Sequence, residues 1–153
     1  MSKNIKFSLS AIEAKDLLAG DSNGFSDPYF KIPHHQNGVV DLPGKKNRTK
    51  VIKKTLNPVW NHTFEIEFNP QKCNKLNIEV FDYDIIGKDD PIGNATINLD
   101  WMISGRQDTF DQWIPLTVKV PVMQIYLPSQ ERSHYPLQVN MKKEDSQDSA
   151  QYQ

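Results

Sequence analysis

Apolar and polar residues alternate with a period of two along much of this chain. The alternation begins at residues 5–10 and returns in later segments, each bounded by Asp, Asn, Gly or Pro. Such alternation predicts β-strands that bury one face against a core. The later segments are residues 29–32, 49–52, 63–68, 76–81 and 92–99.

The chain beyond residue 112 holds further apolar segments. Residues 113–116 predict a short packed segment, and residues 122–127 and 137–141 each have the pattern of a strand that could close the fold. A helical period occurs only around residues 99–103. Together these patterns predict an all-β fold in which two antiparallel sheets pack face to face.

A length of 153 residues is typical of one domain. We place the domain at residues 1–141, with its core at 5–127, and expect residues 142–153 to be a disordered polar tail because they offer almost nothing apolar to bury. No apolar run approaches the roughly 20 residues that span a bilayer, so any membrane contact is expected to be peripheral. A single cysteine, Cys73, excludes an internal disulfide and agrees with a cytoplasmic location.

Aspartates gather beside two of the predicted strands. Asp82 and Asp84 follow an apolar strand and leave the same face of it, and Asp90 comes six residues later. Asp21 and Asp27 bracket a polar turn before another strand. Carboxylate oxygens on flexible loops suit calcium better than magnesium or zinc. For either pair alone, the plain alternative is turn chemistry, because an Asp side chain often bonds to nearby backbone.

An EF-hand is the first calcium site to test against this spacing. Asp82, Asp84 and Gly87 fall at its first, third and sixth positions. The fifth position is Ile86, however, and the twelfth is Gly93 instead of a bidentate glutamate, while strands flank the segment in place of helices. The EF-hand is therefore rejected.

Three blocks of sequence resemble the signature of C2 domains, the family of modules found in protein kinase C and synaptotagmin. Residues 14–31 resemble the first calcium loop and the next strand (GDSNGFSDPYFK), residues 54–64 a loop-to-strand signature (TLNPVWN), and residues 80–93 the third loop (FDYD to DDPIG). The resemblance covers about residues 5–120. It implies an eight-stranded Greek-key β-sandwich, and the position of the first block favours the permuted type II topology, with the last strand supplied from residues 137–141 or a neighbouring segment.

The resemblance also implies the residues that bind calcium at one end of the sandwich. Two ions are expected instead of three, because Gly87 stands where some relatives place a serine. Asp89 is an additional acid with no assigned role. The implied ligands are the side chains of Asp21, Asp27, Asp82, Asp84 and Asp90, with the backbone carbonyls of Ser22 and Tyr83 as further candidates.

Calcium would act on such a site as an electrostatic switch. Two ions cancel about four of the five negative charges and can accept lipid phosphate oxygens as ligands. We expect a monomeric, non-catalytic signalling module that targets membranes, moving from the cytoplasm to the inner face of the plasma membrane or another anionic membrane when calcium rises. Phosphatidylserine is the expected lipid. We expect membrane insertion of Phe25, Ile85 and Ile86, the alternative being packing against neighbouring loops.

A basic stretch at residues 45–54 contains no acid and offers a second surface for anionic lipid. Alternation places Lys46, Arg48 and Lys50 on one face, where phosphoinositides could bind. The alternative is that these lysines only keep an exposed strand soluble and unpaired. The full basic patch is Lys46, Arg48, Lys50, Lys53 and Lys54.

Three other classes of function compete with membrane binding. A calcium-modulated adaptor could recruit a protein partner through the basic strand or the C-terminal tail. Nucleic-acid binding is not expected, because no aromatic residues interleave with the basic ones. An enzyme could use Asp82 and Asp84 as a metal-bound pair, but the chain has no phosphate-cradling glycine loop and no nucleophile elbow.

Histidines and tryptophans receive no site. His34 and His35 lie on a long loop without further metal ligands at a suitable spacing, so we expect them to be exposed to solvent. Large aromatic residues usually pack in the core. We therefore expect packing in the sandwich or against its ends for Trp60, Trp101 and Trp113.

Overall fold

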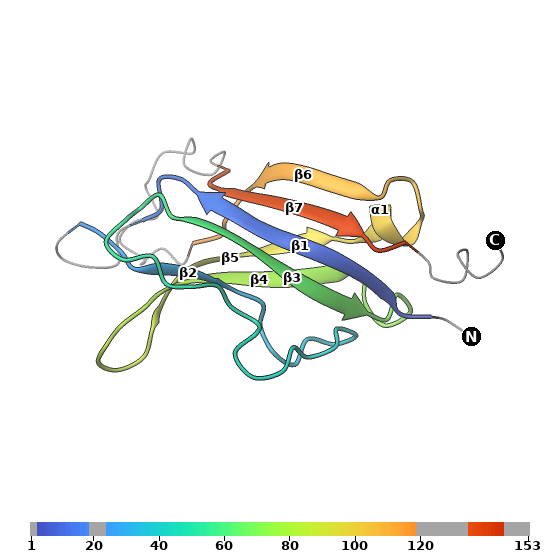
Figure 1. The fold of residues 1–153 in the computed structure, drawn as a ribbon, viewed down its shortest axis with the longest axis horizontal. Coiled ribbons are helices and arrows are strands. Elements are labelled where there is room, and N and C mark those ends of the chain that lie inside the picture. Colours follow the sequence, from blue (N-terminus) through green and yellow to red (C-terminus); the bar gives the residue numbers. More distant parts are fainter. Residues whose placement is uncertain (1–2, 19–23, 119–134, 146–153) are drawn as a thin grey trace.

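The computed structural model describes residues 3–18, 24–118 and 135–145. These residues form seven strands and one short helix, arranged as two layers of long strands (Figure 1). The elements in chain order are β1 (Ile5–Ala14), β2 (Pro28–Lys31), β3 (Val59–Phe68), β4 (Lys75–Asp82), β5 (Asp90–Asn98), α1 (Asp100–Ile103), β6 (Thr109–Ile114) and β7 (Leu137–Lys143).

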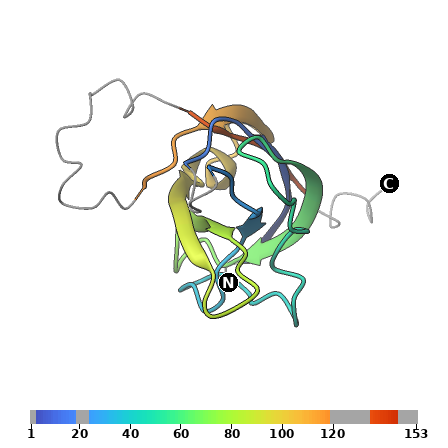
Figure 2. The same cartoon turned by 90° about the vertical axis from the view of Figure 1, so that its left-hand side faces the viewer.

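Two antiparallel sheets make up the layers. The first sheet has the strand order β3-β1-β7-β6, and the second has the order β2-β4-β5. Figure 2 views the sandwich from the end at which the loop between β4 and β5 projects. The predicted all-β sandwich of antiparallel sheets is confirmed. The count of eight strands and the permuted type II topology stay predictions.

Strand β7 lies beside β1, so the C-terminal segment completes the sheet next to the first strand. Leu9 of β1 pairs with Met141 on one side and with Phe64 of β3 on the other. Strand β7 continues to Lys143, which places the first two residues of the expected tail in the sheet. The predicted strand at 122–127 and the remainder of the tail from 146 lie outside the described residues.

The predicted strand at residues 49–52 does not form a regular strand. The segment runs beside β2, with an isolated bridge between Arg48 and Lys31. The Phe30 N–H donates to the Thr49 hydroxyl at 3.0 Å, whereas the Thr49 N–H donates to the Phe30 carbonyl at 2.9 Å. A side-chain oxygen that takes the place of a backbone carbonyl competes with the ladder of a regular strand. The Asn47 side chain does the same at Ile32, whose carbonyl accepts the Asn47 amide at 2.8 Å, so side chains replace backbone groups at two points of this ladder.

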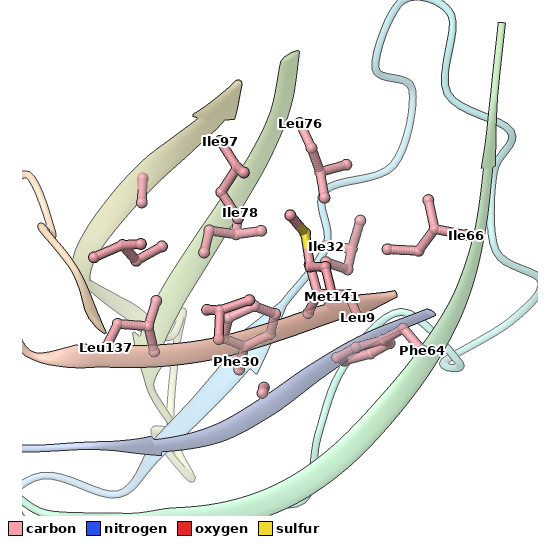
Figure 3. Close-up of a cluster of buried hydrophobic side chains, with 14 of the residues drawn as sticks. Leu9, Phe30, Ile32, Phe64, Ile66, Leu76, Ile78, Ile97, Leu137 and Met141 are labelled. Carbon is pink, nitrogen blue, oxygen red and sulfur yellow. The ribbon is translucent and has the colours of Figure 1, made fainter. Parts of the chain in front are cut away.

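Side chains from both sheets meet in one apolar core (Figure 3). Phe30 of β2 is fully buried and lies between two aromatic rings, with its centroid 5.7 Å from that of Phe64 and 6.0 Å from that of Trp60. Alternation along each strand brings these residues inward. The core thus holds β2 against the first sheet and fixes the start of β2, where the candidate site lies.

The tryptophans do not all follow the prediction. Trp60 and Trp101 are partly buried against the core, and the Trp60 indole N–H donates to the Pro28 carbonyl at 3.1 Å. Trp113 instead stands on the outer face of the first sheet with 36% of its surface exposed. Ile114, the next residue of β6, takes the inward position, and side chains alternate along a strand. For Trp113 the alternative of packing in the interior of the sandwich was therefore wrong.

The helical period near residue 100 is confirmed by the short helix α1. No helix in the described part of the chain is long and apolar enough to span a bilayer. His34 and His35 are exposed, as predicted, and the Nδ1 atom of His35 lies 3.0 Å from an Asp41 carboxylate oxygen.

Candidate functional site

Three of the predicted calcium ligands lie side by side at one end of the second sheet. Asp82, the last residue of β4, pairs with Pro28 at the start of β2 and with Asp90 at the start of β5. Asp27 immediately precedes Pro28. Sheet register therefore brings Asp27, Asp82 and Asp90 to neighbouring strand ends, although 55 residues separate Asp27 from Asp82. We call this end of the sandwich, with residues 24–27 and 83–89, the acidic tip (Figure 1).

Asp82 is the buried member of the group. It continues the inward-facing row of β4, after Ile78 and Val80, and only 2% of its surface is exposed. One of its carboxylate oxygens, Oδ1, accepts the Asp27 N–H at 2.8 Å. Burial of a carboxylate costs free energy unless its charge is compensated. Packing of the core therefore does not explain an aspartate at this position.

Asp27 connects the parts of the tip. Its carboxylate Oδ1 accepts the Lys54 N–H at 2.7 Å, and its carbonyl accepts the Tyr83 N–H at 3.0 Å. The loop before β2, the loop after β4 and the end of the basic stretch are therefore held together by one residue. A disturbance at Asp27 would move all three segments.

Asp84 lies beyond the end of β4 and is exposed, as is Asp90. The Asp84 N–H donates to Asp89 Oδ1 at 2.9 Å, and the second oxygen of Asp89 accepts the Tyr29 hydroxyl. Asp89, the acid with no role assigned from the sequence, thus fastens the loop that carries Asp84 to the outer face of β2. The sequence offered no signal for this contact except the acid itself.

The electrostatics of Tyr29 keep that contact intact. Burial, reinforced by the hydrogen bond to the Asp89 carboxylate, raises the pKa of the Tyr29 hydroxyl to about 12. The hydroxyl therefore remains protonated and able to donate at physiological pH. On the other side, the Arg48 guanidinium carbon lies 5.6 Å from the centre of the Tyr29 ring, so this tyrosine links the tip to the basic stretch.

Apolar residues project from the far end of the tip. Ile85 and Ile86 are 84% and 86% exposed, and Phe25 is about half exposed. Gly87 follows with a φ of +89°, a conformation that side chains rarely adopt, and an added Cβ there would meet nothing within 4 Å. The positive φ of the turn explains why a glycine stands at position 87. Ile85 and Ile86 lie on the surface and do not contribute to the core.

The basic residues are arranged as alternation predicted. Lys46, Arg48 and Lys50 point outward, and the residues between them, Asn47 and Thr49, are buried. Lys53 and Lys54 are exposed. Sequence reasoning missed Lys31 of β2, whose Nζ lies 5.4 Å from the centre of the Phe81 ring, next to the strand that carries Asp82.

Part of the predicted metal site lies outside the described residues. Asp21 and Ser22 fall in residues 19–23 and are not described. In the parts of the chain that are described, no three His, Cys, Asp or Glu side chains converge closely enough to hold a metal ion. The calcium site therefore stays a prediction, for which the structure supplies the arrangement of Asp27, Asp82 and Asp90.

Fold and tip together define an antiparallel β-sandwich with acidic loops and exposed apolar residues at one end. The sequence profile of the C2 domain matches residues 6–116. The chain belongs to the C2 domain family, as the three sequence blocks predicted. C2 domains are binding modules that target proteins to membranes.

Known proteins with similar sequences carry the match as a small part of a longer chain. The chain is 40% identical over 103 residues to protein kinase C, eye isozyme, of Drosophila melanogaster, covering 66% of this chain and 14% of that protein. It is 35% identical over 129 residues to synaptotagmin-1 of Rattus norvegicus, covering 76% of this chain and 30% of that protein. The match therefore informs on the module and not on the activity of either whole protein.

A solved structure with a similar fold is that of two C2 domains of extended-synaptotagmin 2 with calcium bound. The TM-score is 0.64 at 26% sequence identity, and the match covers 94% of this chain and 47% of that chain. Human GIVD cytosolic phospholipase A2 matches with a TM-score of 0.67 at 22% identity, covering 95% of this chain and 18% of that chain, which shows the fold alone.

Proposed function

We propose that this chain is a calcium-dependent module that binds anionic phospholipid membranes through its acidic tip. The observation that carries the proposal is the buried carboxylate of Asp82, in register with Asp90 and bonded to the backbone of Asp27. The candidate ligands at this edge are carboxylate and carbonyl oxygens, the hard ligands that calcium prefers. The residues present therefore fit calcium.

The proposed ligands are the side chains of Asp21, Asp27, Asp82, Asp84 and Asp90, with the carbonyls of Ser22 and Tyr83 in support. We propose two ions, because Gly87 has no side chain to contribute an oxygen to a third. Bound calcium would neutralise the tip and take lipid phosphate oxygens as additional ligands. The protein supplies the carboxylates, their backbone contacts and the apolar residues beside them.

Calorimetric titration of the wild-type protein with calcium tests the site without a membrane. We expect a saturable heat with about two ions bound per chain, because each ion needs several of the carboxylates. The absence of heat at millimolar calcium removes the proposed function. A heat that saturates at one ion per chain is compatible with calcium-dependent binding but contradicts the proposed number of two ions.

Ile85 and Ile86 are proposed to insert into the interfacial region of the bilayer. Replacement of both by alanine should weaken binding to phosphatidylserine vesicles by roughly 10- to 100-fold, because full burial of one aliphatic side chain contributes about 1.5–3 kcal/mol and the interfacial region buries only part of each isoleucine. The exposed positions predict little change in folding stability. Vesicle co-sedimentation at saturating calcium measures the effect.

Calcium affinity in solution provides the control for the isoleucine variant. Neither side chain offers an oxygen, so the double variant should bind calcium as the wild type does when no lipid is present. Unchanged vesicle binding by the double variant would assign Ile85 and Ile86 to contacts with neighbouring loops.

Asp89 is proposed to position Asp84 for calcium. Asp89→Ala removes the acceptor of both the Asp84 N–H and the Tyr29 hydroxyl, so the loop should lose order and calcium affinity should fall by roughly 3- to 10-fold. Asp89→Asn retains an acceptor for the amide and should stay close to wild type in the same calorimetric titration. An equal loss in both variants shows that the negative charge matters and not the contacts.

A second lipid site is proposed at the basic patch. Lys46, Arg48 and Lys50 share one face, and Lys31 extends it onto β2. Each Lys or Arg near an anionic surface contributes about 1 kcal/mol, which suits a multiply charged phosphoinositide. Replacement of Lys46 and Lys50 by Gln should remove a preference for phosphoinositide vesicles over phosphatidylserine vesicles. A wild type with no such preference assigns the patch to solubility.

A further inference from the structure

Exposed apolar residues are not confined to the isoleucine loop. Trp113 at the end of β6, Tyr135 before β7 and Leu18 after β1 are each between one-third and just over one-half exposed. All three lie at the end of the sandwich that carries the acidic tip, because Ile114 and Ala14 both pair with Leu137 there. We call Leu18, Trp113, Tyr135 and the adjoining Lys15 the side rim.

Contacts through the Lys15 backbone and side chain hold the rim together. The Lys15 N–H donates to the Pro136 carbonyl at 2.8 Å, which places the chain after β1 beside the residue that follows Tyr135. The Lys15 ammonium lies 5.2 Å from the centre of the Trp113 ring. A cation and two aromatic rings are therefore presented on adjacent segments.

The rim is continuous with the acidic tip. The Ser26 hydroxyl donates to the Leu18 carbonyl at 3.3 Å, so Leu18 lies next to the segment that contains Phe25 and Asp27. Phe25 is about half exposed. These contacts place the segments that carry Leu18 and Phe25 next to each other, and Lys15 lies three residues before Leu18 in the chain.

The composition of the rim suits the boundary between lipid headgroups and acyl chains. Trp and Tyr have an apolar body and a polar edge, and they are enriched at this boundary. Lysine extends its apolar stem along such a surface while its ammonium faces phosphate. The nearest strand neighbours of Trp113 on the outer face, Gln138 and then Glu13, are polar, and the next residue of the row is the exposed Val59.

We infer that the side rim is a second membrane contact, so that the module docks tilted toward the β6 edge of the first sheet, with Trp113 at the headgroup boundary. This inference rests on the proposed membrane function. The side rim would add a membrane contact on the first sheet, whereas the proposed calcium loops and the basic patch lie on the second sheet and its loops.

The test uses vesicles of phosphatidylserine and phosphatidylcholine, with and without brominated acyl chains, at saturating calcium. Brominated lipid should quench part of the tryptophan fluorescence of the bound wild type, and Trp113→Phe should remove that part while Trp60 and Trp101 remain. Trp113→Ala should bind the vesicles roughly 3- to 10-fold more weakly than the wild type.

Two controls separate a membrane contact from a general defect. Trp113→Ala should bind calcium in solution as the wild type does, because Trp113 lies on β6 of the first sheet and is not one of the proposed ligands. Val40→Ala alters a half-exposed valine near the opposite end, where the Val40 N–H donates to the Glu67 carbonyl, and should bind vesicles normally.

The possible failures are distinguishable. A wild type that does not bind the vesicles with calcium overturns the proposed function and the rim with it. A wild type that binds, without quenching that depends on Trp113 or with unchanged affinity in Trp113→Ala, overturns the rim alone. A wild-type dimer in sedimentation that Trp113→Ala makes monomeric also overturns the inference and assigns the rim to a contact between two copies.

Discussion

Asp82→Asn should abolish calcium-dependent membrane binding while the protein remains folded. The asparagine carbonyl can still accept the Asp27 N–H, so the backbone contact at the tip is retained. The substitution removes one negative charge from the most buried position of the proposed site. At an effective dielectric near 20, a unit charge about 4 Å from another contributes roughly 4 kcal/mol, and more for the double charge of calcium. Calcium affinity should therefore fall by at least about 100-fold, as measured by calorimetric titration.

Asp100→Asn is the matched control for this charge change. Asp100 begins α1, which lies at the opposite end of the sandwich (Figure 1). Its Oδ1 accepts from the Asn74 side-chain amide at 3.2 Å, a contact that asparagine can keep. This variant should bind calcium and vesicles as the wild type does. Calcium-dependent vesicle binding that survives in Asp82→Asn would contradict the role assigned to Asp82.

Phe30→Ala should reduce the free energy of unfolding by about 3–5 kcal/mol, the range observed when a buried aromatic residue is truncated. Phe30 is fully buried between Phe64 and Trp60 and holds β2 against the first sheet. Urea unfolding in the presence of a calcium chelator measures this loss without a contribution from bound ions. Phe30→Leu, which retains most of the volume, should lose less and provides a folded variant if alanine prevents folding.

Ile85→Ala is the control for the core substitution. The substitution truncates a large apolar side chain to alanine, as Phe30→Ala does. Because Ile85 is 84% exposed, the free energy of unfolding should change by less than about 0.5 kcal/mol. A Phe30→Ala protein as stable as the wild type would show that the aromatic cluster does not hold the sheets together.

The regular strands could be predicted from the sequence because buried apolar and exposed polar residues alternate along them with a period of two. The pattern at residues 5–10 located β1, and the pattern at 137–141 located β7, although both strands extend beyond these predicted ranges. Hydrogen bonds to neighbouring strands carry β1 on to Ala14, across an irregularity between Ala11 and Glu13 that alternation does not reveal.

Two departures have local physical causes. At residues 49–52 the alternation correctly predicted that Thr49 faces inward and Lys50 outward. The Thr49 hydroxyl, however, accepts the Phe30 N–H in place of a backbone carbonyl, and the segment is not a regular strand. Trp113 was expected in the interior or against an end of the sandwich because of its size, and the parity of β6 places Ile114 in the interior instead. Hydrophobicity alone does not choose between adjacent residues when both are apolar.

The candidate site was predictable in its residues but not in its contacts. Spacing and family resemblance indicated Asp27, Asp82 and Asp90, and sheet register places them at neighbouring strand ends. The burial of Asp82 follows the parity of β4, which the alternation of Leu76, Ile78 and Val80 already carries. The sequence did not reveal that Asp89 joins the Asp84 backbone to Tyr29, because this contact depends on side-chain directions in a loop, which have no repeating pattern.

Co-sedimentation of the wild-type protein with vesicles, as calcium is raised from chelator to millimolar concentration, tests most directly whether the acidic tip is a calcium switch. Vesicles containing phosphatidylserine should bind the protein only when calcium is present, and chelator added afterwards should release it. Vesicles of phosphatidylcholine alone should bind much less. Binding to phosphatidylserine vesicles that is equal with calcium and with chelator, or no binding under either condition, would contradict a calcium switch at the acidic tip.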